Sequence, residues 1–229
     1  MKQTLIIFAV LLAACFSATA QHYQLIESFN LAASEGGFGI YSDIDPTGSR
    51  DMIVDMDAPN YSQRVQMFLP FSKLSSFLKS LDQAKECFMR WREIAKNQGI
   101  THFSKDIPVV FGDQAMYFTS NDKWFRENGV NLKCRFLVDE GGNYYLVLDT
   151  DYMTSDQVVQ HGVSYSSAYN ATSGRWSTSW ARSETTVIHY CPGASLFFSS
   201  EQEVNNFAAK LNMVKQWKEG NIAAGKLFK

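Results

Sequence analysis

The sequence lacks the motifs that mark the common enzyme classes. Its four histidines show neither H-x-x-x-H nor H-E-x-x-H spacing, which excludes the usual zinc-hydrolase signature. No G-x-S-x-G motif positions a nucleophilic serine. The glycine pairs at 36–37 and 141–142 do not open a predicted helix, as a phosphate-binding loop would. These absences favour a non-enzymatic protein, and the sequence predicts no catalytic residue, metal site or cofactor.

Cysteine is also scarce, and its spacing excludes metal and redox pairs. The three cysteines beyond Cys15 are Cys87, Cys134 and Cys191, separated by 47 and 57 residues. In an exported chain one disulfide among them would leave one free thiol. The alternative is three buried, reduced side chains, because cysteine is a small apolar residue. The sequence leaves both alternatives open.

Long apolar runs are absent apart from one at the N-terminus. Lys2 precedes an apolar run of eleven residues, Leu5–Cys15, and the small-residue sequence Ala18-Thr19-Ala20 follows it. A charged start, a short apolar core and an A-x-A site are typical of a secretory signal peptide. A membrane-spanning helix needs roughly 20 apolar residues. We therefore expect residues 1–20 to be removed, leaving an exported periplasmic or extracellular chain.

A second mode of cleavage competes with this one. Leu12-Ala13-Ala14-Cys15 resembles the bacterial lipobox, in which the cysteine is lipidated and becomes the new N-terminus. In that alternative Cys15 tethers the protein to a membrane. Otherwise we expect no membrane contact.

Neither sign of charge dominates. The chain carries 21 basic and 23 acidic residues, for a net charge of −2. Loss of residues 1–20 removes one lysine and no acidic residue. A nucleic-acid-binding protein normally presents a basic face, so the composition argues against a nucleic-acid partner.

A group of carboxylates in the N-terminal half partly matches the pattern of a cation site. The sequence Asp43-x-Asp45-x-Thr47-Gly48-x-x-Asp51 has the alternating oxygen ligands of a calcium loop. However, Val54 occupies the twelfth position, where such a loop needs a bidentate glutamate. We interpret these residues as solvated carboxylates of a turn and its flanking strand ends.

Two stretches have the spacing of amphipathic helices. In 72–97, apolar residues recur every three or four positions, with Ser72 as the expected N-cap and Gly99 as the stop. This stripe contains Leu74, Phe77, Leu78, Leu81, Ala84, Phe88, Trp91, Ile94 and Ala95. A second stripe predicts a helix over 200–219. It begins with the capping box Ser200–Glu203 and is expected to end at Gly220.

Short segments with alternating apolar residues predict strands between and before these helices. They cover 22–30, 36–45, 51–57, 61–69, 107–111, 115–119, 131–139, 143–149, 157–169, 175–189 and 194–198. A helical turn is expected at 121–128. The sequence therefore predicts an α+β fold, with an antiparallel sheet packed against two helices. Residues 21–229 form a single domain, with two fused halves (about 21–100 and 101–220) as the alternative.

The two halves share a pattern that predicts an internal duplication. Apolar residues around the first helix match those around the second at a constant offset of 130. The matched sets are Met67-Phe68, Leu74, Phe77 and Leu81 against Phe197-Phe198, Val204, Phe207 and Leu211. This order of strands followed by a helix, given twice, resembles the layout of PUR-repeat and Whirly-type folds. The resemblance is one of element order, and the nucleic-acid-binding motifs of those folds are absent.

The strongest candidate for a binding surface is the hairpin over 155–190. Tyr165, Tyr169, Trp176 and Trp180 are spaced by four within each strand, so each pair shares a face. Aromatic rings flanked by hydroxyl groups and arginines are typical of surfaces that bind sugars, peptides or proteins. We therefore expect an exported, non-enzymatic protein that binds an unknown protein or glycan through these four residues.

Two other functions are weighed against this one. In the first, a hydrolase site assembles from dispersed residues, with His161 and His189 as cross-strand neighbours close to Asp149 or Asp151. In the second, the protein is a structural subunit whose exposed sheet pairs with further copies of the same chain. Convergence of the side chains would support the first, and concentration-dependent size the second.

Overall fold

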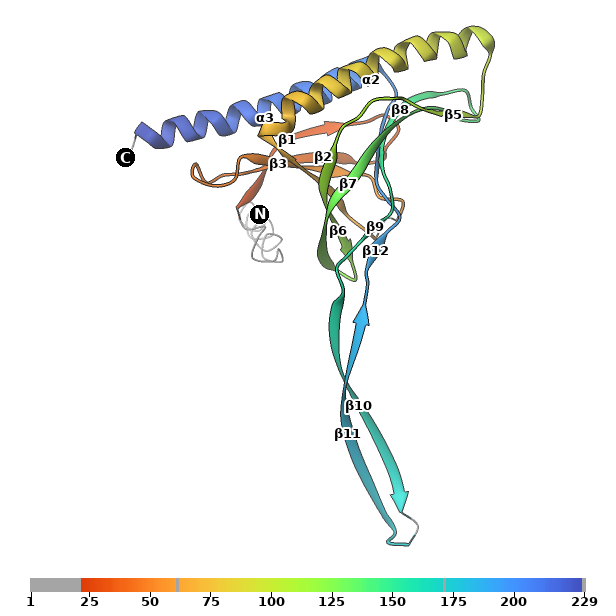
Figure 1. Cartoon of the computed structure of the whole chain (residues 1–229), viewed down its shortest axis with the longest axis vertical. Helices are drawn as coiled ribbons and strands as arrows, with labels where there is room; N and C mark the ends of the chain where they lie inside the picture. Colours follow the sequence, from red (N-terminus) through yellow and green to blue (C-terminus); the bar gives the residue numbers. More distant parts are fainter. Residues whose placement is uncertain (1–21, 61, 171, 228–229) are drawn as a thin grey trace, which may run out of the picture.

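A single curved sheet with two long helices on one face forms the body of the protein, and a two-stranded ribbon projects from it (Figure 1). The computed structural model describes residues 22–60, 62–170 and 172–227, so residues 1–20 and Cys15 lie outside it. The side chains of Gln160, His161, Ser164, Tyr165 and Ser183 are likewise not described. The predicted α+β class is confirmed.

The secondary structure agrees with most of the predicted elements. The helices are α2 (Phe71–Gln98) and α3 (Glu201–Leu227). The strands are β1 (Tyr23–Asn30), β2 (Gly37–Asp43), β3 (Asp51–Met56), β4 (Val65–Pro70), β5 (Phe103–Asp106), β6 (Asp113–Ser120), β7 (Lys123–Val138), β8 (Tyr144–Thr150), β9 (Met153–Thr154), β10 (Val158–Asn170), β11 (Arg175–Val187), β12 (Tyr190–Cys191) and β13 (Ser195–Phe198). The predicted hairpins correspond to the antiparallel pairs β2–β3, β7–β8 and β10–β11.

The main sheet has nine strands in the order β1-β2-β3-β4-β6-β7-β8-β13, with β5 added beside β7. Strands β1 to β4 precede α2 in the chain, and β5, β6, β7, β8 and β13 of the same sheet precede α3. Helix α2 contacts β4, β7 and β8, whereas α3 contacts β1, β2, β3 and β13. Each helix thus covers strands from the other half of the chain. The apolar core lies between the helices and this face of the sheet.

The long strand β7 joins the two halves of the sheet. It begins after a two-residue turn in which Asn121 and Asp122 both have positive φ, the conformation of a type I′ hairpin. The helical turn expected at 121–128 is therefore wrong, because these residues are the turn and first strand residues of a hairpin. At Gly129, φ is 75°, and the pairing with β6 shifts register beside it. This bulge lies just before β7 passes from its pairing with β6 to its pairing with β8.

Helix α2 follows the prediction closely but differs in its cap. Pro70 occupies the N-cap position and makes no side-chain cap, so the expected cap at Ser72 is wrong. Proline is tolerated there because the first helical amides lack intrahelical partners. Gly99 ends the helix in the left-handed conformation, as predicted. Ile94, placed in the apolar stripe, is instead 52% exposed, although its neighbour Ala95 is buried.

Helix α3 begins as predicted and continues beyond its predicted end. The Ser200 hydroxyl accepts a hydrogen bond from the Glu203 amide, although the Glu203 carboxylate bonds Ser199 rather than completing the box. The expected stop at Gly220 is wrong, since the helix runs to Leu227. Its last turns lie against the β2–β3 turn, where a Cβ on Gly225 would come 3.0 Å from Pro46.

A buried lysine attaches α3 to the same turn. Lys218 is fully buried, and its Nζ donates to the backbone carbonyls of Asp43 and Asp45 at 2.5 and 2.6 Å. An ammonium group without such partners would be very costly to bury. The interaction therefore fixes the β2–β3 turn under the helix, and the pattern of apolar residues gave no indication of it.

The acidic residues near this turn are structural. The Asp43 carboxylate accepts hydrogen bonds from the amides of Asp45 and Ser49, at 2.8 and 2.9 Å. Asp43 and Asp51 are both buried, so the expectation that they are solvated is wrong for these two. Asp51 accepts a hydrogen bond from the Tyr23 hydroxyl. These carboxylates hold the turn and the neighbouring strand together.

The connector after α2 also differs from the prediction. The strand in this region is β5, which pairs with β7, and not the predicted segment 107–111. Ile107 and Phe111 are buried in the core from an irregular segment. These residues are apolar because they are buried. A short apolar segment can be buried whether or not it is a strand, so its composition does not identify a strand.

The cysteines are buried thiols. Cys87, Cys134 and Cys191 are all free and buried. Burial raises the pKa of the Cys134 and Cys191 thiols, which keeps them protonated and unreactive. The sequence leaves open either one disulfide or three buried, reduced side chains, and the structure shows the second alternative.

The offset of 130 holds in the helices and fails in the strands. Leu74, Phe77 and Leu81 and their counterparts Val204, Phe207 and Leu211 are all buried. In the strands, Met67 is buried whereas Phe197 is not, and its neighbour Phe198 is buried instead. The strand correspondence is wrong because more residues separate strand from helix in the second half. The duplication itself stays a prediction.

We predict that Lys218→Met destabilises the protein by about 2–3 kcal/mol, because the buried carbonyl of Asp43 and the partly buried carbonyl of Asp45 lose their donor. The free energy of unfolding from urea titrations measures this loss. Lys215→Met, which removes a more exposed lysine of the same helix, should change stability by less than about 0.5 kcal/mol. Equal effects of the two substitutions would contradict the role given to Lys218.

Candidate functional site

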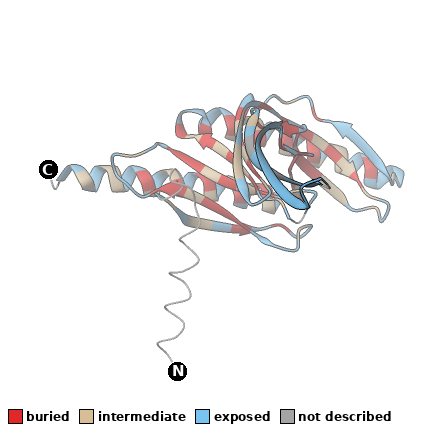
Figure 2. Ribbon diagram, turned by 90° about the horizontal axis from the view of Figure 1, so that it is seen from below, coloured by how far each residue is buried: buried red, intermediate tan, exposed pale blue. Residues whose placement is uncertain are grey.

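The predicted binding hairpin is the ribbon formed by β10 and β11. These strands pair with each other over thirteen residues and pack extensively against no other described element. The ribbon extends from the body on the side away from the helices (Figure 1), and most of its described residues are exposed (Figure 2). At about 3.3 Å per residue it is about 43 Å long.

The strand register places the four predicted aromatic residues together. Tyr165 is paired with Trp180, and Tyr169 with Trp176, so the four positions lie on one face of the ribbon. The rings of Tyr169 and Trp176 are 5.3 Å apart. Trp176 is 71% and Trp180 63% exposed, so neither belongs to the core. We call this surface the aromatic face; the side chain of Tyr165 is not described.

The other face of the ribbon has a different character. Its positions alternate with those of the aromatic face and carry no aromatic residue and, apart from Arg175 at the tip, no charged one. They are Val158, Gln160, Gly162, Ser164, Ser166, Ala168 and Asn170 on β10, and Arg175, Ser177, Ser179, Ala181, Ser183, Thr185 and Val187 on β11. The hydroxyl groups of Ser166 and Ser179 hydrogen-bond across the pair at 2.7 Å. Large rings are thus confined to one side of the ribbon.

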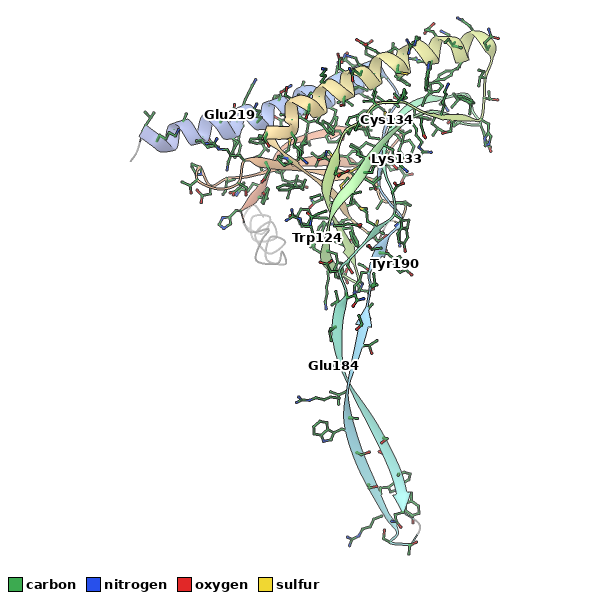
Figure 3. The ribbon with its side chains drawn as sticks, viewed as in Figure 1. Trp124, Lys133, Cys134, Glu184, Tyr190 and Glu219 are labelled. Atoms are coloured by element: carbon green, nitrogen blue, oxygen red, sulfur yellow. The ribbon has the colours of Figure 1, made fainter. Side chains whose placement is uncertain are left out.

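The base of the ribbon is held firmly on the body. His189 is buried, its ring stacks on Phe125 with centroids 4.3 Å apart, and its Nδ1 lies 3.2 Å from the Ser120 hydroxyl. The backbone of His189 exchanges hydrogen bonds with Ser155, including its amide to the serine hydroxyl at 2.9 Å. Gln63 donates from Nε2 to the Tyr190 carbonyl at 3.1 Å. Figure 3 shows Tyr190 at this junction.

The residues of the alternative hydrolase site do not come together. His161 is paired with Glu184, so the expected pairing of His161 with His189 is wrong. The true register leaves His189 at the base, beyond the end of the ribbon. The described part of the chain holds no group of histidine, cysteine and carboxylate side chains that could bind a metal ion.

The two carboxylates of that alternative site are each paired with a cation. Asp149 forms an ion pair with Arg135 at 2.5 Å, and Asp151 with Lys133 at 2.5 Å. Burial raises the pKa of Asp149, against the opposing effect of Arg135. These pairs occupy the carboxylates that would have oriented a histidine.

The structure also shows a cleft that the sequence did not indicate. It has a volume of about 720 Å³ and lies on the face of the sheet opposite the helices. Outward-facing residues of β2, β3 and β4 form its floor, and the β6–β7 hairpin forms one wall. Trp124 belongs to this wall and lies near the base of the ribbon (Figure 3). This volume is within the range of small-molecule sites.

A hydrogen-bonded network lies in the floor of the cleft. The Asp55 carboxylate accepts from the Gly39 amide at 2.9 Å, the Tyr41 hydroxyl at 3.1 Å and the Gln66 amide nitrogen at 2.9 Å. Gly39 is required because a Cβ there would lie 2.5 Å from the Tyr41 hydroxyl oxygen. Burial, with the nearby Asp55 carboxylate, raises the pKa of Tyr41 to about 12. Tyr41 is therefore a neutral donor fixed in position.

Two arginines border the same cleft. The Arg126 guanidinium lies over the rings of Phe68 and Tyr117, 5.6 and 5.5 Å from their centroids, and its Nε donates to Asn128. Arg64 lies directly before β4, is exposed and also lines the cleft. Within the described chain, neither guanidinium forms an ion pair with a carboxylate.

The sequence pattern gives no sign of the cleft, because its residues are scattered along the chain. They come from 23–41, 53–66 and 117–126, and only the strand order brings these segments together. Polar residues at alternate positions of β3 and β4 indicate which face of the sheet points outward. The shape of that face also depends on the twist of the sheet, which the alternation of residues does not reveal.

In comparisons with known proteins, no family model, no curated protein and no solved structure matched the chain. Neither described helix contains a segment apolar enough to cross a membrane.

We predict that the stability of the protein falls as pH rises from about 10 to about 12, in part through Tyr41. The pKa of Tyr41 is near 10 in the unfolded chain and about 12 in the folded one, so the unfolded chain loses this proton first and is favoured. The free energy of unfolding can be measured by urea titration at about pH 9 and at about pH 11.5. Its decrease between the two pH values should be smaller for Tyr41→Phe than for the unaltered protein. Equal losses would contradict the raised pKa.

Proposed function

We propose that this is an exported, non-enzymatic protein that binds a partner in the cell envelope or outside the cell through the aromatic face of its ribbon. The exposure of Trp176 and Trp180 carries the proposal. A globular protein normally buries such rings, and a patch of them on an otherwise polar element is typical of an interaction surface. Apart from the smaller Val159 and Val163, the ribbon's other described large apolar side chains that are exposed are these rings, so they are the main source of binding energy.

The energetics of the ribbon support a bound state. An isolated two-stranded hairpin is only marginally stable in water, and among the described elements no third strand pairs with β10–β11 and no helix packs extensively against it. Burial of apolar surface contributes about 25 cal/mol per Å², so a partner on the aromatic face would stabilise both the complex and the ribbon. The anchored base keeps the ribbon directed away from the body.

The place of action follows from the N-terminal sequence. Residues 1–20 have the features of a signal peptide, and cleavage after Ala20 would release the chain into the periplasm or the medium. Lipidation at Cys15 is the alternative and would tether the body to a membrane. In either case the ribbon is available to a partner, which is a protein or a glycan.

Self-association is the second candidate, because among the described strands β10 and β11 pair only with each other. Natural proteins normally protect unpaired strand edges with lysine, proline or short strands. Residues 158–187 contain neither lysine nor proline, and their charged residues are Arg175, Arg182 and Glu184. A second copy of the chain could therefore add its own strands to the ribbon. The dispersed hydrolase site has no comparable support.

Photo-crosslinking in the native cell tests this proposal. A benzophenone amino acid in place of Trp180 should give a covalent adduct on illumination, because that position faces the partner. The adduct's mass distinguishes the outcomes: twice the chain's mass indicates self-association, and another mass a different protein. The matched control is the same amino acid at Ala168, on the opposite face of the ribbon.

A glycan partner would be detected by co-sedimentation of the purified protein with isolated cell-wall polysaccharide. Trp176→Ala should weaken the crosslink formed from the benzophenone at position 180, and Trp176→Ala with Trp180→Ala should abolish the co-sedimentation. The double variant should leave the free energy of unfolding within about 1 kcal/mol, since the rings are exposed. Global unfolding of this variant, or equal crosslinking from Trp180 and Ala168, would contradict the proposal.

A further inference from the structure

We infer that the cleft opposite the helices is a second binding site, which takes an anionic ligand with a flat apolar group. This site is separate from the aromatic face and does not depend on the function proposed for the ribbon. It is a hollow of about 720 Å³, bounded by β2, β3, β4 and the β6–β7 hairpin. A molecule of 15 to 25 non-hydrogen atoms is about the size that such sites hold.

The charges around the cleft favour an anion. Arg64 and Arg126 both line it, and no described carboxylate forms an ion pair with either. The guanidinium of Arg126 is held over two rings, and one of its five N–H groups is used by Asn128. Its remaining N–H groups form a planar fork, which suits carboxylate, phosphate or sulfonate oxygens.

The acidic residues of the cleft do not cancel this preference. Asp55 already accepts three hydrogen bonds, from Gly39, Tyr41 and Gln66. Its charge is therefore compensated locally in the floor. Asp57 lies exposed at the rim and accepts from the Ser34 hydroxyl at 2.7 Å. The arginines thus remain the charged groups with unused donors.

The apolar part of the ligand would lie against aromatic rings. Tyr117, beneath Arg126, and Trp124, on the next strand, both line the cleft. Both are half-buried, so each keeps part of its ring surface open. A planar group between rings and guanidinium gains both apolar burial and stacking.

The corresponding face of the second half of the sheet differs in how its charged groups are paired. There, Arg135 is paired with Asp149, and the ring of Tyr145 packs edge-on against Phe197 at 6.2 Å. Arginine and aromatic side chains are present on both faces. Only on the first do the arginines lack a carboxylate partner within the described chain.

Fluorescence titration with 1-anilinonaphthalene-8-sulfonate, an anionic aromatic probe, tests this inference on the intact mature chain. We expect saturable binding that weakens about tenfold or more in Arg126→Gln and in Arg64→Gln, since each substitution removes a charged donor. Added salt should also weaken binding. The uncharged analogue N-phenyl-1-naphthylamine should bind these variants and the unaltered protein equally.

Two controls separate the cleft from the ribbon. Arg175→Gln removes an equivalent charge at the ribbon tip, and the double variant Trp176→Ala, Trp180→Ala removes its rings; both should bind the probe as the unaltered protein does. No saturable binding, or losses as large in these controls as in Arg126→Gln, would overturn the inference. So would an equal loss of the neutral analogue, because charge would then not be recognised. None of these results bears on crosslinking from Trp180.

Discussion

The burial of two long amphipathic helices against one face of a single antiparallel sheet is the interaction on which the rest of this structure depends. Because α2 lies over strands of the second half and α3 over strands of the first, the core is shared by the whole chain. Phe77, Phe88 and Phe207 are completely or almost completely buried at this interface. Each helix packs on strands of both halves, so loosening of one helix exposes strands that belong to the other half.

This arrangement leaves the opposite face of the sheet uncovered by the two helices. The helices occupy only one face, and the second face is partly solvated, as antiparallel sheets allow. Two features occupy the free side: the cleft between β2 and the β6–β7 hairpin, and the ribbon that leaves the body beyond β8. Phe125 lines the cleft and also stacks on His189 at the base of the ribbon. The two candidate binding surfaces therefore share one rigid support.

The sequence predicts the elements with strong periodicity and misses those set by tertiary contacts. The stripes around Phe77 and Phe207 identify both helices, and the alternation in 131–149 and 157–189 identifies two hairpins. The continuation of α3 past Gly220 could not be predicted, because it depends on Lys218 and on contact with the β2–β3 turn. The aromatic residues were found by their spacing of four. The cleft was not, since strand order and twist bring its walls together.

The central claim is that a partner covers the aromatic face in the native setting. Oxidative footprinting of tryptophan, performed on the purified protein and again in intact cells, tests it most directly. The account predicts that Trp176 and Trp180 are labelled readily in the purified protein and are protected in cells, whereas the half-buried Trp217 on α3 is labelled to the same extent in both. Equal labelling of Trp176 and Trp180 in the two settings would contradict it.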